Sequence, residues 1–270
     1  MSDTAAPTSP PAGDSPLSRH NPTVKLALVF VVSVVMLFVF DPLTPSVLYA
    51  MALVGVIATA RIPPRTLVVA HIPFAAFALG LFLVNALSRP GEVLWEAGIV
   101  QVTAEGVTVG AALAMRTLVI GILSIGFLAS TDPVALMTSL HQNARLSARV
   151  TYAILAGYRM LQEMPREWDT IRRAHAVRAP LRSDGNPPRG LRDLGRAAFT
   201  LLVISIRKGE RMAQALESRG LGLTPRSTWR PVPVQPTDAV FAATVLAVLL
   251  GVLLASAALG FLEGFSALAN

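Results

Sequence analysis

Two arginines stand at the ends of predicted helices, each between small residues. The tripeptides are Val177-Arg178-Ala179 and Ser218-Arg219-Gly220. An arginine side chain presents five hydrogen-bond donors in a rigid fork that suits carboxylates and the exposed carbonyls of helix ends. Either ending alone is explained by helix capping and by attraction to the helix dipole, worth about 0.3–1 kcal/mol. The same arrangement twice in one segment favours docking contacts on another protein.

A third arginine, Arg116, lies near the middle of a long apolar run, residues 106–129. A charge at the centre of a membrane helix costs about 2.5–3.5 kcal/mol on insertion scales, which makes this arginine a candidate functional residue. The structural alternative is that Arg116 pairs with a helix-end carbonyl, or with a carboxylate of residues 130–236, and ties two parts of the chain together. In the same run, Gly106 and Gly110 form a G-x-x-x-G pattern, which permits close helix packing.

Other kinds of chemistry have no recognisable motif in the chain. There is no G-x-x-x-x-G-K-[ST] phosphate loop, no H-E-x-x-H zinc motif and no G-x-S-x-G nucleophile elbow. The four histidines are far apart in the sequence, and without cysteine there is neither a disulfide nor a thiolate metal site. We therefore expect a non-catalytic protein with no cofactor and no metal site.

The composition is typical of a membrane protein. Of the 270 residues 53% are hydrophobic and 14% are charged, whereas a soluble domain carries about 25% charge. The mean hydropathy is +0.57. A membrane span needs about 20 apolar residues, so the first two of five candidate stretches are short. The candidates are residues 24–40, 46–60, 66–87, 106–129 and 239–262.

The positive charge of the chain gathers between the fourth and fifth candidate spans. Residues 130–236 hold 17 of the 23 basic residues and have a net charge of +9, while the rest of the chain has −2. The positive-inside rule places this segment in the cytoplasm. Alternation across five spans then places the N-terminus inside and the C-terminus outside. The arginines are not interleaved with aromatic residues, so we expect no nucleic-acid binding.

The basic segment is predicted to contain several helices. Asp132 followed by Pro133 is typical of a helix N-cap and first turn. A helix is expected up to Pro165, another from there to Arg178, and a long one that ends at Gly220. The sequence therefore predicts that both arginine tripeptides close helices.

Together these features resemble a known family. The chain is similar to the transmembrane T component of energy-coupling factor (ECF) transporters, the EcfT/CbiQ family, whose members carry Ala-Arg-Gly motifs at the ends of two coupling helices. Besides the two tripeptides, the similarity rests on NPTVKL at 21–26, on the run at 105–140 that contains Arg116, and on YRMLQEMPREWDTIRRAHAVRA at 158–179. It covers residues 20–230. The first tripeptide departs from the motif, since Ala179 replaces the glycine.

The resemblance implies an all-α integral membrane protein of about five transmembrane helices, with a cytoplasmic coupling-helix module inserted before the last span. Residues 1–18 are rich in Pro, Ser, Ala and Gly and are predicted to be a disordered tail. Four transmembrane helices are expected within residues 19–129, the coupling helices within 130–236, and the last span with the C-terminal tail within 237–270.

The implied function is that of a coupling subunit of an importer for a micronutrient, a vitamin or a transition-metal ion, in a bacterial or archaeal plasma membrane. Each arginine ending would dock on one of two ABC-type ATPases, which supply ATP hydrolysis, and a separate S component would bind the substrate. Two other hypotheses stay open. One is a permease subunit of another transporter with its own substrate site, which internal repeats or clustered polar residues at mid-membrane would favour. The other is a membrane-bound enzyme or regulator.

Overall fold

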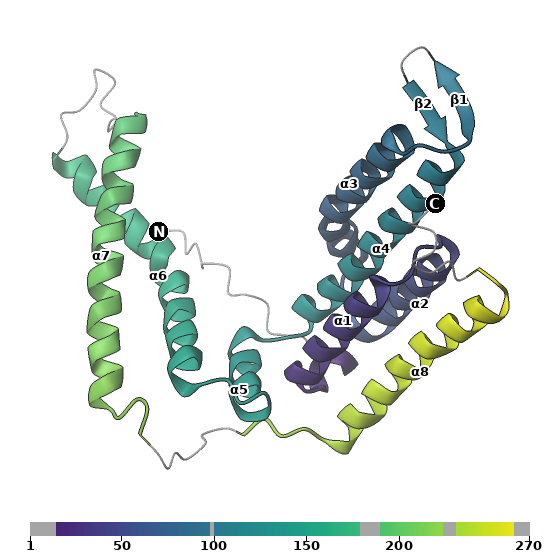
Figure 1. Cartoon of the computed structure of the whole chain (residues 1–270). Helices are drawn as coiled ribbons and strands as arrows, with labels where there is room; N and C mark the ends of the chain where they lie inside the picture. The colour runs from purple at the N-terminus through teal and green to yellow at the C-terminus, as the bar shows by residue number, and fades with distance from the viewer. Residues whose placement is uncertain (1–14, 98–99, 179–189, 224–230, 262–270) are drawn as a thin grey trace. The chain divides into compact units, whose positions relative to one another are not determined.

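The computed structural model describes residues 15–97, 100–178, 190–223 and 231–261 (Figure 1). The chain divides into two compact units. The first consists of Met1–Ser139 together with Val232–Asn270, and the second of Leu140–Pro231. The predicted limits of the coupling module, residues 130–236, enclose the second unit and stay a prediction.

The first unit is built from apolar helices: α1 (Pro22–Met36), α2 (Leu43–Ala60), α3 (Pro64–Ser88), α4 (Ala104–Ala129) and α8 (Pro236–Ala258). Four of them, α2, α3, α4 and α8, are long and apolar enough to cross a membrane, and α1 is a shorter apolar helix. The 15 residues of α1 extend over about 22 Å, less than the ~30 Å of the hydrocarbon layer. The prediction of an all-α membrane protein is confirmed, and the count of five spans stays a prediction.

α3 and α4 form a closely packed antiparallel pair (Figure 1). A Cβ atom at Gly106 would lie 2.6 Å from the carbonyl oxygen of Asn85, and one at Gly110 would lie 2.9 Å from that of Phe82. Only glycine allows two backbones to approach so closely. The predicted role of the G-x-x-x-G pattern in close helix packing is confirmed.

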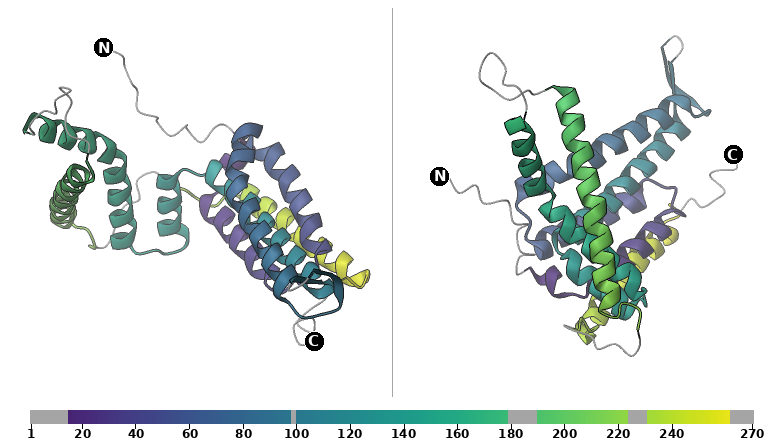
Figure 2. Two further views of the ribbon diagram at one scale, coloured as in Figure 1. Left: turned by 90° about the horizontal axis from the view of Figure 1, so that it is seen from above. Right: turned by 90° about the vertical axis from the view of Figure 1, so that its left-hand side faces the viewer.

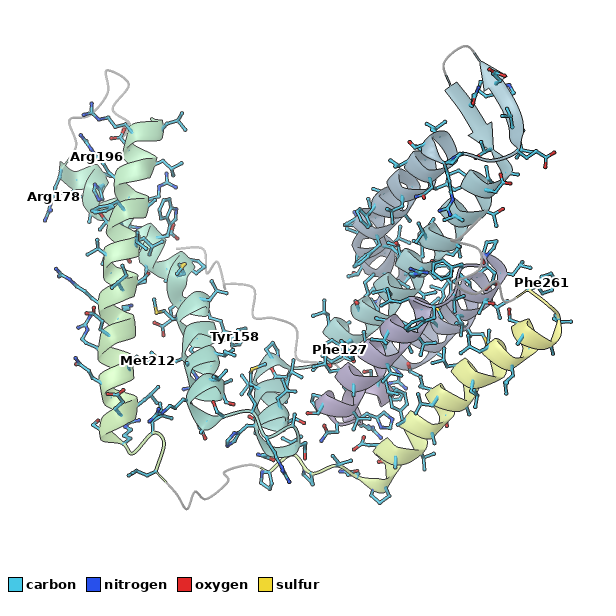
Figure 3. All side chains as sticks on the ribbon, viewed as in Figure 1. Phe127, Tyr158, Arg178, Arg196, Met212 and Phe261 are labelled. Carbon is cyan, nitrogen blue, oxygen red and sulfur yellow. The ribbon has the colours of Figure 1, made fainter. Side chains whose placement is uncertain are left out.

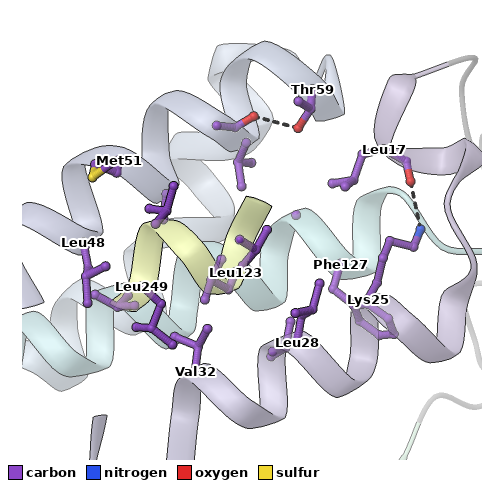
Figure 4. A pocket seen from close by; sticks show the side chains of 18 of the residues that line it. Leu17, Lys25, Leu28, Val32, Leu48, Met51, Thr59, Leu123, Phe127 and Leu249 are labelled. Atoms are coloured by element: carbon purple, nitrogen blue, oxygen red, sulfur yellow. Dashed lines mark hydrogen bonds between the residues drawn. The ribbon is translucent and has the colours of Figure 1, made fainter. Parts of the chain in front are cut away.

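Side chains between α1, α2, α4 and α8 form part of the core of the first unit. Met36 and Ile122 are fully buried there, in two neighbouring apolar clusters. Figure 4 shows an apolar pocket of about 290 Å³ lined by the same helices. Lys25 lies at this pocket, and its Nζ donates a hydrogen bond to the carbonyl of Leu17 at 3.2 Å. The ammonium group of Lys25 is thus bound by a backbone carbonyl of the chain and connects α1 to the turn that contains Leu17.

The ordered structure begins earlier than the sequence predicts. Pro16–Arg19 form a short 3-10 helix, η1, whose N-cap is Ser15. Leu17 of this turn is buried among apolar residues that include Val56 and Ile125. The prediction of disorder up to residue 18 is therefore wrong for residues 15–18, because one leucine gains tertiary contacts that local composition does not reveal. Residues 1–14 of the predicted tail lie outside the described residues.

A β-hairpin, which the sequence did not predict, connects α3 to α4. β1 (Val93–Ala97) pairs antiparallel with β2 (Val100–Thr103). Val, Trp and Thr favour strands, but nine strand residues are too few to stand out in an otherwise helical sequence. The prediction of an all-α chain holds in the described residues apart from this hairpin.

The second unit contains α6 (Ala148–Arg178) and α7 (Leu191–Ser218), and α5 (Pro133–Asn143) precedes them in the chain. Asp132 caps α5, since its Oδ2 accepts a hydrogen bond from the backbone N–H of Ala135 at 2.8 Å, and this prediction is confirmed. The predicted break at Pro165 is wrong, because α6 continues through it as one helix. Proline removes one backbone hydrogen bond and bends a helix without necessarily ending it. Figure 2 shows that α6 bends.

Candidate functional site

Arg178 is the last residue of α6, and Figure 3 shows its side chain at the helix end. The side chain is exposed, and that of Val177 beside it is 88% exposed. Within the described part of the chain, the Arg178 guanidinium has no hydrogen-bond or ion-pair partner. Ala179, the third residue of the predicted docking tripeptide, lies outside the described residues. The arginine at this helix end is therefore accessible to another molecule.

The second tripeptide forms a complete backbone cap at the end of α7. Gly220 has a φ of +80°, which favours glycine because a side chain would clash in this conformation. Its N–H donates to the carbonyl of Glu217 at 2.9 Å, and the N–H of Leu221 donates to that of Leu216 at 3.0 Å. This pair of hydrogen bonds is the Schellman motif, which satisfies carbonyls that a helix end otherwise leaves open.

Arg219 is the C-cap residue of α7 and is exposed. Because backbone N–H groups already bind the last carbonyls, the Arg219 guanidinium is not needed to cap the helix. It has no hydrogen-bond or ion-pair partner among the residues that the structure describes. Ser218, the first residue of the tripeptide, donates its hydroxyl to the carbonyl of Ala215 at 3.0 Å. The end of α7 thus leaves the Arg219 side chain exposed, and its guanidinium takes no part in the helix cap.

α6 and α7 pack side by side and antiparallel. Lys208 forms an ion pair with Glu167, and His175 Nε2 lies 3.3 Å from Thr200 Oγ1. Both pairs fit the same antiparallel register of the two helices. In this register Arg178 of α6 lies opposite Ala197 of α7. Arg219 is 22 residues further along α7, or roughly 33 Å at the rise of an α-helix. The structure therefore places the two predicted docking arginines at opposite ends of the helix pair and does not bring them together.

One face of α7 is apolar and exposed, and we call it the α7 stripe. Its residues recur every three or four positions, which puts them on one side of the helix. Leu202 and Ile206 are 55% and 53% exposed, whereas Ala197 on the opposite side is buried. The stripe consists of Leu191, Gly195, Ala198, Leu202, Ile206, Gly209 and Ala213. The sequence gives no signal for it beyond the short apolar run at 197–206, since the exposure of a helix face depends on which side packs against α6.

Arg116, in the middle of α4, contacts the turn between α1 and α2. Its Nη2 donates to the carbonyl of Val39 at 2.7 Å, and its guanidinium carbon lies 5.6 Å from the ring centroid of Phe40, within cation–π range. Arg116 Nε and Asp41 Oδ1 are buried without partners among the described residues. A carbonyl after a helix end was one predicted partner of Arg116. A carboxylate of residues 130–236 was the other, and that alternative stays a prediction.

A buried polar cluster joins the starts of α1 and α8, and no sequence motif predicts it. Asp238 Oδ1 accepts from the backbone N–H of Asn21 at 2.9 Å and lies 3.0 Å from His20 Nδ1. The Asn21 side chain accepts from the N–H of Thr23 at 2.9 Å and from the hydroxyl of Ser139 at 2.7 Å. An Asn before a proline is a common helix start, but the pairing with a residue 217 positions away is not visible in sequence.

The described residues hold no group of three or more His, Asp or Glu side chains placed to bind a metal ion. Four polar features remain as candidates for function: the two arginine endings, Arg116 and the cluster around Asn21. Three of these four belong to helix ends or to the turns beside them.

Comparison with known proteins gives a consistent result. The family CbiQ, described as cobalt transport protein, matches residues 13–229. A relative from Acidaminococcus fermentans is 24% identical over 218 residues, which cover 77% of this chain and 80% of the relative. Relatives from Heliobacterium modesticaldum and Limosilactobacillus fermentum are each 25% identical, with 86% and 87% of this chain and 89% and 91% of the relatives covered.

All three relatives are named energy-coupling factor transporter transmembrane protein EcfT. The family match covers both arginine tripeptides, Arg116 and the Asn21 side of the polar cluster, but not Asp238. Its extent, together with the apolar helices described above, leads to one conclusion: the chain belongs to the CbiQ/EcfT family of multi-pass transmembrane proteins of energy-coupling factor transporters.

Proposed function

We propose that this protein is the non-catalytic coupling subunit of an ECF-type importer. It transmits the movement of two ABC-type ATPases, which hydrolyse ATP, to a substrate-binding S component. The observation that supports this proposal most directly is the pair of exposed arginines, Arg178 and Arg219, at opposite ends of the antiparallel α6–α7 pair. Val177, Ala179, Ser218 and Gly220 flank them and complete the two docking tripeptides.

The geometry favours docking over capping as the role of these arginines. The last carbonyls of α7 are bound by backbone N–H groups, so the Arg219 guanidinium is free to bind another surface. A separation of roughly 33 Å along the helix axis lets the two arginines contact two different subunits. A guanidinium that enters a groove lined by carboxylates or helix-end carbonyls gains several charge-assisted hydrogen bonds at once.

The α7 stripe is the surface that we assign to the S component. Its large residues, Leu202 and Ile206, are exposed, and an added Cβ at Gly195 or Gly209 would meet nothing within 4 Å. An apolar helix face with small residues allows another helix to approach closely. Movement of α7 would then act on the S component directly.

The orientation follows from charge. The +9 segment that contains α6 and α7 would face the cytoplasm, where ATP is available, and the N-terminus would lie on the same side. The C-terminus would lie outside. The transported substrate would be a micronutrient, a vitamin or a transition-metal ion, and its recognition belongs to the S component rather than to this chain.

Charge reversal at the two arginines tests the docking proposal. The double variant Arg178→Glu/Arg219→Glu should insert in the membrane at wild-type level but co-purify with neither ATPase, and uptake should be lost. The matched control is Arg159→Glu/Arg166→Glu, which makes the same charge change at two exposed arginines within α6. This control should keep both ATPases. Retention of the ATPases and of uptake by the first variant would show that the arginines do not dock.

A second experiment tests the α7 stripe. Leu202→Asp places a charge on the stripe, whereas Leu161→Asp places it on α6 at a leucine of similar exposure, 61% against 55%. Leu202→Asp should reduce co-purification of the S component at least tenfold and leave the ATPases bound, while Leu161→Asp should retain both. Equal loss of the S component in the two variants would exclude the stripe as its specific binding surface.

A further inference from the structure

The β1–β2 hairpin is rooted directly at the ends of two membrane-spanning helices. β2 ends at Thr103, which is the N-cap of α4, so no residue separates strand from helix. Three contacts fix this junction. The Thr103 hydroxyl donates to the carbonyl of Arg89 at 2.9 Å, the N–H of Ala104 donates to the carbonyl of Glu92 at 2.8 Å, and the N–H of Glu92 donates to Glu105 at 2.7 Å.

This connection limits how far the hairpin residues can lie from the bilayer. Trp95 pairs with Val102, two residues before α4 begins. Two strand residues span about 7 Å, which is close to the thickness of one headgroup layer, about 5–8 Å on each side of the hydrocarbon core. In Figures 1 and 2 the hairpin also turns away from the line of α3 and α4 instead of prolonging it. If α4 enters the hydrocarbon layer near its first residues, this distance puts Trp95 within reach of the lipid headgroups.

Large apolar side chains cover the first strand of the hairpin. Val93, Leu94 and Trp95 are 46%, 62% and 58% exposed. The register slips between Val93 and Trp95, so Leu94 is the extra residue of a β-bulge, a feature that bends a strand and redirects side chains. The exposed pair Glu96 and Gln101, further from α4, is instead polar and joined by a hydrogen bond of 2.9 Å. The apolar residues Val93, Leu94 and Trp95 thus lie nearer to α3 and α4 than the polar Glu96–Gln101 pair does.

We propose that this hairpin is an interfacial anchor, in which Leu94 and Trp95 insert into the headgroup region of the lipid bilayer beside α3 and α4. Tryptophan favours this depth because its ring is apolar and its N–H is polar. A two-stranded hairpin is marginally stable alone in water, so a lipid surface also stabilises it. The anchor would hold the tightly packed α3–α4 pair in place while the coupling helices move.

The fluorescence of Trp95 in a lipid bilayer tests this proposal. Trp168→Phe and Trp229→Phe remove the other two of the three tryptophans, which leaves Trp95 as the only emitter in the full chain. The protein is reconstituted in phosphatidylcholine vesicles that carry bromine atoms near the headgroup or deep in the acyl chains. We expect at least twofold quenching by the shallow bromines, less by the deep ones, and weak quenching by aqueous acrylamide.

Two variants of this single-tryptophan chain provide the control. Leu94→Glu puts a charge beside the ring and should shift the emission to the red and increase quenching by acrylamide at least twofold. Gln101→Lys adds a charge at the polar pair, where it still donates to Glu96, and should leave both quantities unchanged. The proposal is overturned if Trp95 emits as in water without bromine quenching, or if it becomes shielded only when a partner protein is added. Circular dichroism of each variant verifies that the helices are intact.

Discussion

At the scale of the residue, Arg116 shows how a costly side chain can be a structural tie. A charged group in the middle of a membrane helix suggests function, yet its Nη2 binds the carbonyl of Val39 and its guanidinium lies near Phe40. These contacts connect α4 to the turn after the short helix α1. The buried Asp41 beside that turn caps α2 through the N–H of Thr44 at 2.7 Å. The turn is therefore held from two sides.

Substitution of Arg116 separates the structural role from a transport role. Arg116→Leu should destabilise the folded protein by about 1.5–3 kcal/mol, since it leaves the Val39 carbonyl unpaired and removes a charged hydrogen bond. Arg116→Lys should lose less stability, because the lysine ammonium group can still donate a hydrogen bond to the Val39 carbonyl. Thermal unfolding in detergent measures the stability of both variants. Normal stability of Arg116→Leu with loss of uptake would instead identify a functional charge.

At the scale of the element, the end of α7 depends on one backbone conformation. Gly220 adopts a φ of +80°, and the cap that it forms sets the direction in which Arg219 leaves the helix. By contrast, Gly209 lies inside α7 with ordinary helical geometry and open space around it. The same substitution should therefore have opposite effects at these two glycines.

Gly220→Ala should destabilise the end of α7 by about 1 kcal/mol, because a side chain disfavours the left-handed conformation. Gly209→Ala should stabilise the helix by about 1 kcal/mol, since alanine is the better helix former. Hydrogen exchange of the amides of Leu216–Gly220 measures the first effect as faster exchange, and exchange in the middle of α7 measures the second as slower exchange. If the amides of Leu216–Gly220 exchange in Gly220→Ala at the same rate as in the unchanged protein, the cap does not control the helix end.

At the scale of the whole molecule, the proposed mechanism requires two separate contacts. Arg178→Glu alone should release the ATPase bound at the end of α6, and Arg219→Glu alone should release the one bound at the end of α7. Each single variant should thus retain part of the ATPase that the double variant loses. The ratio of ATPase to this subunit after purification, measured by quantitative mass spectrometry, checks this expectation. Complete loss in either single variant would show that the two sites are coupled.

The sequence alone determined the membrane character, the basic segment and the two helix ends at Arg178 and Gly220. Hydrophobic runs, charge excess and glycine or proline stops are local properties, and they are read from neighbouring residues. The same local reasoning was wrong at Pro165, because a proline bends a long helix as readily as it ends one. It also missed the hairpin at Val93–Thr103, whose strands are too short to leave a periodic pattern.

Only the tertiary structure decided which groups meet. The bond from Arg116 to Val39 joins residues 77 positions apart, and that from Asn21 to Asp238 joins residues 217 positions apart. The structure likewise ordered Leu17 against α2 and set Arg178 and Arg219, the two proposed docking arginines, at opposite ends of the α6–α7 pair. A hydrogen bond depends on distance in space, and distance in space depends on how helices pack. A local pattern can therefore predict a helix end, while its partners follow only from the fold.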